Sequence, residues 1–279
     1  MSSRHHQARV DWYFNEMSST WTKIYSAPTV YGVIHQHRMA VVLDWIDELA
    51  LPKGSRILEV GCGAGFTAVE LGRRGYTIDA MDSSEAMVER ASRNAIESDV
   101  DNRVRVFRGD VHSLPFENDL FDLVLAMGVI PWLESPATPV QEMARVLRPG
   151  GYVIFTSDNL IRLNHLIDPR RNPALAPLRR ILKYALHRAR LRKPHMAPNL
   201  VHMHTTWYMD RIVSQNRLQT EKAITLGFGP FSFLGRRLLP ESLGIRLHHR
   251  LQRLADHGVP GVRSTGSQYL ILAKKPRAL

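Results

Sequence analysis

The sequence predicts an α/β protein built on an open, mostly parallel sheet with helices on both faces. Two observations carry this prediction. Between residues 56 and 156, short apolar runs alternate with helical patterns over short connections, which is typical of parallel strands joined by right-handed crossovers. The first apolar run also leads directly into Gly61, Gly63 and Gly65 and then into a helical pattern. A strand, a glycine turn and a helix start form the ligand-binding unit of such sheets.

Five strands are expected in this region, and three helices connect them. The run at 121–127 is almost continuously apolar, as a strand buried on both faces should be. Ser84 suits the N-cap of the second helix, because its hydroxyl can accept a bond from an exposed backbone amide. The expected strands cover residues 57–60, 76–81, 104–108, 121–127 and 152–156. The expected helices start near residue 66 and cover about 84–98 and 137–147.

The first segment, 1–50, is expected to form a helical cap on the core, which we assign to residues 51–160. Apolar spacing predicts a helix over about 30–49 that ends before Pro52. Tyr13, Trp21 and Tyr25 precede it. Two roles are open for these aromatic residues: they line a ligand pocket under the cap, or they pack between helices.

A basic segment, 161–204, is expected to be an insertion next to the core. It holds ten Lys or Arg and one acidic residue, Asp168, so +9 of the net charge of +11 comes from it. Apolar residues at helical spacing within 178–189 predict a basic amphipathic helix. Three interpretations remain open: a solvated lid over the site, a contact with an anionic membrane surface, or a surface for nucleic acid or an acidic partner.

The last segment, 205–279, is expected to complete the sheet. A helix is predicted over 205–215, followed by strands at 218–228 and 267–273. Some forty residues separate these strands and include a second basic amphipathic stretch, 243–254.

Several motifs together resemble one family, the class I S-adenosylmethionine (SAM) methyltransferases. Leu-Glu-Val-Gly-Cys-Gly-Ala-Gly at 58–65 resembles the family's first motif, and further matches follow in order at Asp82, 109–116, 121–124 and 147–151. The resemblance covers residues 55–156. It implies a Rossmann-like sheet of seven strands in the order 3-2-1-4-5-7-6, with the last two strands forming an antiparallel hairpin at the edge.

The resemblance also implies SAM as the cofactor. Asp82 stands at the offset where an acid meets ribose hydroxyls. By resemblance, Asp110 takes the adenine amino group, the Val111 amide meets a ring nitrogen, and Met127 runs beside the sulfonium. Arg38 either binds the methionine carboxylate or forms a surface salt bridge. The full set of expected cofactor residues is Arg38, Glu59, Gly61, Cys62, Gly63, Gly65, Asp82, Ser83, Met87, Asp110, Val111 and Met127.

The expected reaction is methyl transfer by in-line displacement, in which the acceptor attacks the methyl carbon and the sulfonium sulfur leaves. Where the acceptor must lose a proton, a base takes it. The sequence does not single out a base. Asp158, just past the fifth strand, and His165, His202 and His204 in the insertion are the candidates that we favour. His35 and His112 also lie in segments within reach of the site. No metal is expected, because no acid or cysteine completes the His202–His204 pair at a recognisable spacing.

Three functions compete at this point. Resemblance to methyltransferases of quinone, phenol, polyketide and porphyrin biosynthesis implies methylation at oxygen or carbon of a small, lipophilic or aromatic acceptor. The positive charge favours an RNA methyltransferase instead, but no Asn-Pro-Pro-Tyr-type motif follows the fourth strand, so nucleic acid is not the expected partner. The third alternative is a non-catalytic SAM-binding protein on a membrane surface. With a single cysteine and no apparent signal peptide, we expect a cytoplasmic protein, peripheral on the inner membrane surface if the insertion contacts lipid.

Overall fold

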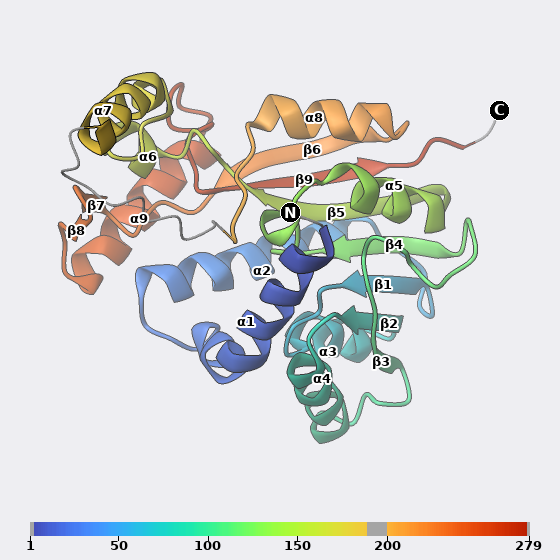
Figure 1. Ribbon diagram of the computed structural model, residues 1–279. Helices are drawn as coiled ribbons and strands as arrows, with labels where there is room; N and C mark the ends of the chain where they lie inside the picture. Colours follow the sequence, from blue (N-terminus) through green and yellow to red (C-terminus); the bar gives the residue numbers. More distant parts are fainter. Residues whose placement is uncertain (1–2, 189–199, 278–279) are drawn as a thin grey trace.

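The computed structural model describes residues 3–188 and 200–277. A single twisted sheet runs through the middle of the molecule with helices on both sides (Figure 1). Its order is β3-β2-β1-β4-β5-β9-β6, which confirms the predicted order, with β9 as the seventh strand of the sheet. The first five strands are parallel, and β9 runs antiparallel to both β5 and β6. These strands are β1 (Arg56–Val60), β2 (Thr77–Asp82), β3 (Val104–Arg108), β4 (Phe121–Ala126), β5 (Leu147–Asp158), β6 (Gln219–Leu226) and β9 (Gln268–Lys274).

One strand is longer than expected. The sequence predicted that the fifth strand begins at residue 152, after a turn at 147–151, whereas β5 begins at Leu147. The backbone of Leu147 pairs with Phe121, and the register shifts before Leu123 pairs with Tyr152. The irregularity absorbs the extra residues in β5, so the strand bends and continues instead of starting after the turn.

The helices follow the predicted order. Thr29 and Ser84 cap α2 and α4, each accepting a bond from a backbone amide three residues further on. Around the sheet lie α1 (Ser3–Ile24), α2 (Val30–Glu48), α3 (Phe66–Arg73), α4 (Glu85–Glu97), α5 (Ala137–Val146) and α8 (Thr206–Gln215), with a 3₁₀ turn at Ile130–Trp132. At one end of the molecule lie α6 (Leu163–Ile167), a 3₁₀ turn at Pro173–Leu175, α7 (Ala176–Arg188), β7 (Ser232–Phe233), β8 (Arg236–Arg237) and α9 (Glu241–Asp256).

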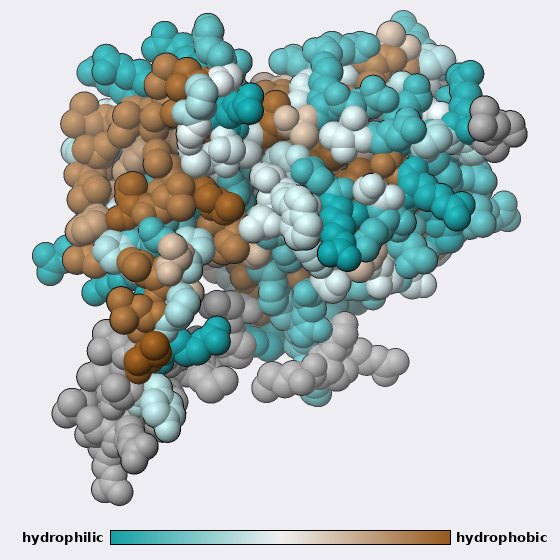
Figure 2. Space-filling model, turned by 90° about the horizontal axis from the view of Figure 1, so that it is seen from above, coloured by the Kyte–Doolittle hydropathy of each residue, from teal (hydrophilic) through white to brown (hydrophobic). Residues whose placement is uncertain are grey.

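Helix α7 forms where the basic amphipathic helix was predicted, at the upper left of Figure 1. Seen from above, hydrophobic side chains gather at this end of the molecule (Figure 2). The hairpin of β7 and β8 was not predicted, because two-residue strands carry no alternating pattern. Residues 189–199 of the expected insertion, with Arg190, Arg192 and Lys193, lie outside the described residues. The division into segments 1–50, 51–160, 161–204 and 205–279 stays a prediction.

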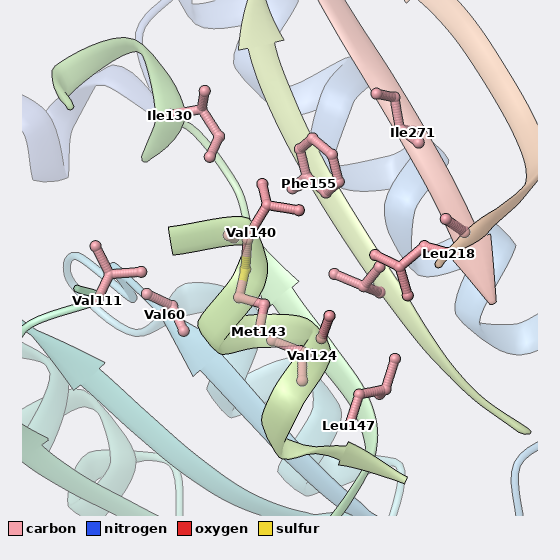
Figure 3. Close-up of a cluster of buried hydrophobic side chains, with 14 of the residues drawn as sticks. Val60, Val111, Val124, Ile130, Val140, Met143, Leu147, Phe155, Leu218 and Ile271 are labelled. Carbon is pink, nitrogen blue, oxygen red and sulfur yellow. The ribbon is translucent and has the colours of Figure 1, made fainter. Parts of the chain in front are cut away.

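Two apolar clusters hold the helices to the sheet, one on each face. Val124 and Phe155 of the sheet pack with Met143 of α5 on one face (Figure 3). On the other face, Ile57 and Leu125 pack with buried residues of α2, α3 and α4. Each fully buried side chain of this size contributes roughly 1.5–3 kcal/mol relative to exposure. The sheet is therefore fixed from both sides, and its carboxyl edge is a rigid base for a site. Among the described helices, none is both long enough and apolar enough to cross a bilayer.

Asn159 fixes the carboxyl end of β5, and its replacement by alanine should destabilise the fold. Its amide nitrogen donates to the carbonyls of Ser264 and Gly266, both at 2.9 Å, and its oxygen accepts from the Ile161 amide. The side chain is 1% exposed. Asn159→Ala leaves two carbonyls without these donors, so we expect the free energy of unfolding in urea to fall by about 2–4 kcal/mol. Asn102→Ala, in an exposed turn, is the matched control and should change it by less than about 0.5 kcal/mol. Equal effects would contradict this account.

Candidate active site

A cavity of about 300 Å³ opens at the carboxyl ends of β1, β2, β4 and β5. Residues of α1 and α2 line its other side. In open α/β sheets, ligands bind at this edge, near the point where the strand order reverses. The order here reverses between β1 and β4, which are neighbours in the sheet. The cavity therefore lies where the fold places a ligand.

The glycine turn after β1 forms one wall of this cavity. Gly61 has a φ of +65°, and a Cβ there would lie 2.4 Å from a methyl carbon of Val129. Gly65 has a φ of +77° and packs against Ala91 of α4, where an added Cβ would lie 2.9 Å from the Ala91 Cβ. Both positions therefore require glycine, one for the turn beside the cavity and the other for close packing of α3 on α4.

Two acidic side chains meet behind this turn. Asp82, at the end of β2, accepts bonds from the Gly63 and Ser84 amides, each at 2.9 Å. Glu59 is 3% exposed, and burial raises its pKa to about 8, against the opposing effect of bonds from Thr67 and Ala68. Burial also raises the pKa of Asp82. Because Asp82 keeps two amide donors, we assign the ionised carboxylate to Asp82 and the protonated acid to Glu59 at neutral pH.

Arg38 is a buried cation on the cavity wall. It is 3% exposed, and its Nη2 donates to the Tyr25 hydroxyl at 3.0 Å. Its Nη1 lies beside Gly128. Within the described residues, no carboxylate forms an ion pair with it and its Nε has no partner. An arginine buried without an acid is costly unless a ligand supplies the negative charge. The surface salt bridge that we considered for Arg38 does not occur among the described residues.

The far half of the cavity is walled by aromatic rings. Tyr13 stacks on Trp132 with 5.2 Å between centroids, and Phe14 meets the same indole edge-on at 4.8 Å. Trp21 packs on Trp132 and on His35, both at about 6.1 Å. These rings line the cavity and also pack on one another, so both predicted roles for the aromatic residues of the first segment are realised.

His35 is a neutral imidazole in this aromatic half. Its Nδ1 lies 2.9 Å from the Tyr31 carbonyl oxygen, which can only accept, so Nδ1 carries the proton and Nε2 keeps a lone pair. Burial and then the charge of Arg38 lower the pKa of His35 to about 3. Burial and then Asp158 raise the pKa of Tyr31 to about 12, so its hydroxyl stays protonated. The cavity thus holds a proton acceptor and a proton donor one helical turn apart.

The expected cofactor residues converge on the cavity, with one exception. Asp110 lines it after β3, and its Oδ1 accepts a bond from the His112 amide at 2.9 Å. Gly65 lies behind the cavity wall, as the cap of α3. The expected residues that line the cavity are Arg38, Glu59, Gly61, Cys62, Gly63, Asp82, Ser83, Met87, Asp110, Val111 and Met127.

Of the four expected catalytic residues, only Asp158 lines the cavity. One of its oxygens is bound by Arg162 at 2.7 Å. His165 is buried in α6, with Nδ1 3.3 Å from the Leu160 carbonyl oxygen.

The remaining pair lies beside the cavity without lining it. The His202 ring packs on His6 at 5.3 Å, and the His204 ring stacks on Tyr208 at 5.2 Å. The roles of all four stay predictions. The described residues contain no group of three His, Cys, Asp or Glu side chains placed to hold a metal ion.

The sequence did not favour His35 over the other histidines as a base, and it did not indicate Tyr31 or Gln268, although all three line the cavity. A signal for His35 was present, because it lies three residues before Arg38 and therefore on the same face of one helix. The carboxamide oxygen of Gln268, at the start of β9, is buried without a partner among the described residues. No sequence pattern marked Gln268. It reaches the cavity because β9 pairs with β5, which places Gln268 opposite Asp158, 110 residues earlier in the chain.

The raised pKa of Glu59 predicts a loss of stability as the pH rises. An acid whose pKa is higher in the folded than in the unfolded state favours folding below its unfolded pKa, near 4.5, and this contribution is lost as the pH rises through about 8. In urea titrations from pH 5 to 9, we expect the free energy of unfolding to fall less in Glu59→Gln than in the unmodified protein. Glu70→Gln, on the surface of α3, is the control and should follow the unmodified protein. If Glu59→Gln shows the same decline, Glu59 is ionised in the folded state.

Comparison with known proteins agrees with this geometry. Residues 58–155 match a family model described as a methyltransferase domain. A ubiquinone biosynthesis O-methyltransferase of Paracidovorax citrulli is 32% identical over 147 residues, which are 52% of this chain and 60% of that protein. The chain therefore spans less than two thirds of the length of the curated relatives that it matches.

Solved structures with the same fold cover almost the whole chain. A magnesium protoporphyrin IX methyltransferase from Synechocystis PCC 6803, with bound S-adenosylhomocysteine (SAH), has a TM-score of 0.63 at 16% identity and covers 98% of this chain and 100% of that one. The [4+2]-cyclase SpnF has a TM-score of 0.62 at 17% identity, with 96% of each chain covered. The matched domain, the motifs and the sheet order confirm the expected domain type, fold and cofactor class: residues 58–155 form a methyltransferase domain of the class I SAM-dependent type.

Proposed function

We propose that this protein transfers the methyl group of SAM to an oxygen or carbon of a small, apolar, aromatic acceptor. The observation that carries the proposal is the composition of the cavity. One half is built from the glycine turn and strand ends of a SAM-dependent family, and the other half is walled by Tyr13, Phe14, Trp21 and Trp132. Aromatic walls favour flat apolar ligands through stacking and burial of apolar area.

We assign the cofactor contacts as the resemblance implies. The ribose hydroxyls bond to Asp82, the adenine amino group to Asp110, and the methionine carboxylate to Arg38. The positions of these three side chains at separate points of the same cavity support the assignment. Arg38 supports it further, because it is buried and lacks an acidic partner among the described residues. Met127, at the end of β4, lies between the glycine turn and the aromatic half and would border the sulfonium.

The chemistry requires little beyond orientation. The acceptor atom attacks the methyl carbon in line with the sulfonium, the carbon–sulfur bond breaks, and SAH leaves with the bonding pair. The positive charge on sulfur disappears, so exclusion of water and alignment are the main tasks. Holding two reactants in attack geometry supplies up to roughly 7–11 kcal/mol. The roof of α1 and α2 over the sheet edge serves both tasks.

For an oxygen acceptor we propose His35 Nε2 as the proton acceptor, in preference to the residues expected from the sequence. Asp158 lines the cavity, but Arg162 binds one of its oxygens, and the three histidines of the insertion do not line it. Burial and then the positive charge of Arg38 lower the pKa of His35. A methionine carboxylate on Arg38 would offset the second of these effects and so raise the proton affinity of His35. Binding of the cofactor would then prepare the base.

We also propose that the protein acts at an anionic membrane surface from the cytoplasmic side. An apolar acceptor of the proposed kind partitions into bilayers, and α7 carries apolar and basic side chains together. An RNA acceptor is less well supported, because the cavity is small and walled by aromatic side chains. The non-catalytic SAM-binding alternative is kept as a test outcome.

The cofactor assignment predicts the effect of Asp82→Ala. Loss of a carboxylate that bonds two ribose hydroxyls should weaken SAH binding at least about 100-fold, because each charged bond contributes roughly 1.5–3 kcal/mol. Isothermal titration with SAH measures this directly. Asp101→Ala, in an exposed turn, is the control and should bind as the unmodified protein does. Undiminished affinity in Asp82→Ala would refute the ribose assignment, and absence of SAH binding in the unmodified protein would favour a role without SAM.

The base assignment predicts that His35→Gln slows methyl transfer while the cofactor site stays intact. With labelled SAM and a set of phenols and hydroxyquinones as acceptors, we expect kcat to fall about 10²- to 10³-fold. The SAH dissociation constant should stay within about threefold, since the carboxylate bonds to Arg38 and not to His35. His204→Gln is the matched control, with a ring outside the cavity wall. Greater loss in His204→Gln than in His35→Gln would return the role to the insertion.

A further inference from the structure

The end of the molecule that holds α7 and the β7–β8 hairpin carries a concentration of exposed apolar side chains. We call it the α7–hairpin surface. In α7, Leu178, Ile181 and Tyr184 are 63%, 66% and 66% exposed. In the hairpin Phe233 and Leu234 are 40% and 44% exposed, and Leu238, directly after it, is 55% exposed. Figure 2 shows the hydrophobic side chains gathered at this end of the molecule. Apolar patches of this kind on a folded protein mark a surface that is covered in use.

Hydrogen bonds fix the two parts of the surface to each other. Arg170 donates to the Leu234 carbonyl, and Asn164 of α6 donates to the Pro230 carbonyl just before the hairpin. Arg179 of α7 donates to the carbonyls of Pro169 and Asn172, at 3.0 and 2.6 Å. The stretch after α6 therefore binds both α7 and the hairpin, so their apolar side chains are presented together.

The charged groups around this surface are mainly positive. Arg170 and Arg171 before α7 and Arg180 within it are exposed, as are Arg236 and Arg237 of the hairpin. The acidic residues in these described segments are Asp168, which is 1% exposed, and Glu241, which is paired with Arg237. The surface thus combines apolar side chains with an excess of exposed cations.

We infer that the α7–hairpin surface docks on an anionic phospholipid bilayer. Apolar side chains enter the interface, while the arginines lie near the anionic headgroups and are attracted to them. Charge complementarity selects this occupant. A second copy of the chain would bring the same arginines face to face, and a nucleic acid offers nothing to cover six apolar side chains. The inference deepens the proposed membrane location and rests on it.

The docked surface is directly connected to the proposed acceptor site. Asp158 lines the cavity at the end of β5, and its partner Arg162 immediately precedes α6. Gly229 lies against Val30 at the start of α2, and Glu241 accepts a bond from the Val30 amide at 2.8 Å. Docking would therefore hold the start of α2, with Tyr31 and His35, beside the lipid from which an apolar acceptor comes.

Co-sedimentation with vesicles tests the inference without any acceptor. We expect the protein to bind phosphatidylcholine vesicles that contain about one third phosphatidylglycerol, and to bind pure phosphatidylcholine at least about tenfold more weakly. Ile181→Asp and Phe233→Asp, one in each part of the surface, should each weaken binding to the anionic vesicles at least about tenfold. The matched control is Ile96→Asp, on α4, whose side chain is 60% exposed and lies outside the surface. It should bind as the unmodified protein does.

Three results would overturn the inference. The first is no preference of the unmodified protein for anionic vesicles. The second is equal binding by Ile181→Asp, Phe233→Asp and Ile96→Asp. The third is a dimer in sedimentation velocity that both surface variants, but not the control, convert to monomer, which would make a second copy the occupant. Titration of the same variants with SAH shows whether they are folded with an intact cofactor site. Loss of vesicle binding with unchanged SAH affinity is therefore a loss of docking alone.

Discussion

The bonds from the Gly63 and Ser84 amides to the Asp82 carboxylate are the constraint on which the site depends. They tie the turn after β1 to the end of β2 and to the cap of α4, and the Cys62 amide adds a bond to the Met81 carbonyl at 3.0 Å. One side chain therefore fixes two strand ends and one helix start. Neutral residues of the same size would lose the charge-assisted bonds, which are about twice as strong as neutral ones.

This arrangement has an electrostatic consequence. An ionised Asp82 lies close to Glu59, and two buried carboxylates in one region are not both charged at neutral pH. Glu59 has the less favourable surroundings, because one of its oxygens lacks a partner among the described residues. The fold thus keeps a protonated acid under the glycine turn, and of these two acids only Asp82 carries a negative charge there. The opposite assignment would leave two amides facing a protonated acid.

The parts of the fold that the sequence predicted are those with a strong local signal. The strand and helix order follows from alternating periods and from the glycine turn, and Asp158 was found because strand ends meet at one edge of the sheet. The β7–β8 hairpin was missed because its two-residue strands have no period. Gln268 was missed because its place in the cavity depends on the pairing of β9 with β5. The histidines of the insertion were favoured because their segments could reach the site, and no local pattern in those segments indicates where a ring points.

Helix α2 carries side chains that line both halves of the cavity. Arg38, at the proposed cofactor end, and His35, at the proposed acceptor end, lie on one face of α2, and Tyr31 lies one turn before His35. The Tyr25 hydroxyl accepts a bond from Arg38, and the Tyr25 ring packs on Phe66 of α3 at 5.3 Å, so Arg38 also ties the roof to the core. An anion on Arg38 acts on the roof and on the imidazole at once. In the proposed enzyme, the cofactor would therefore order the acceptor half of the cavity before the acceptor enters, and α2, whose first turn lies against the α7–hairpin end, would carry that effect toward the lipid surface.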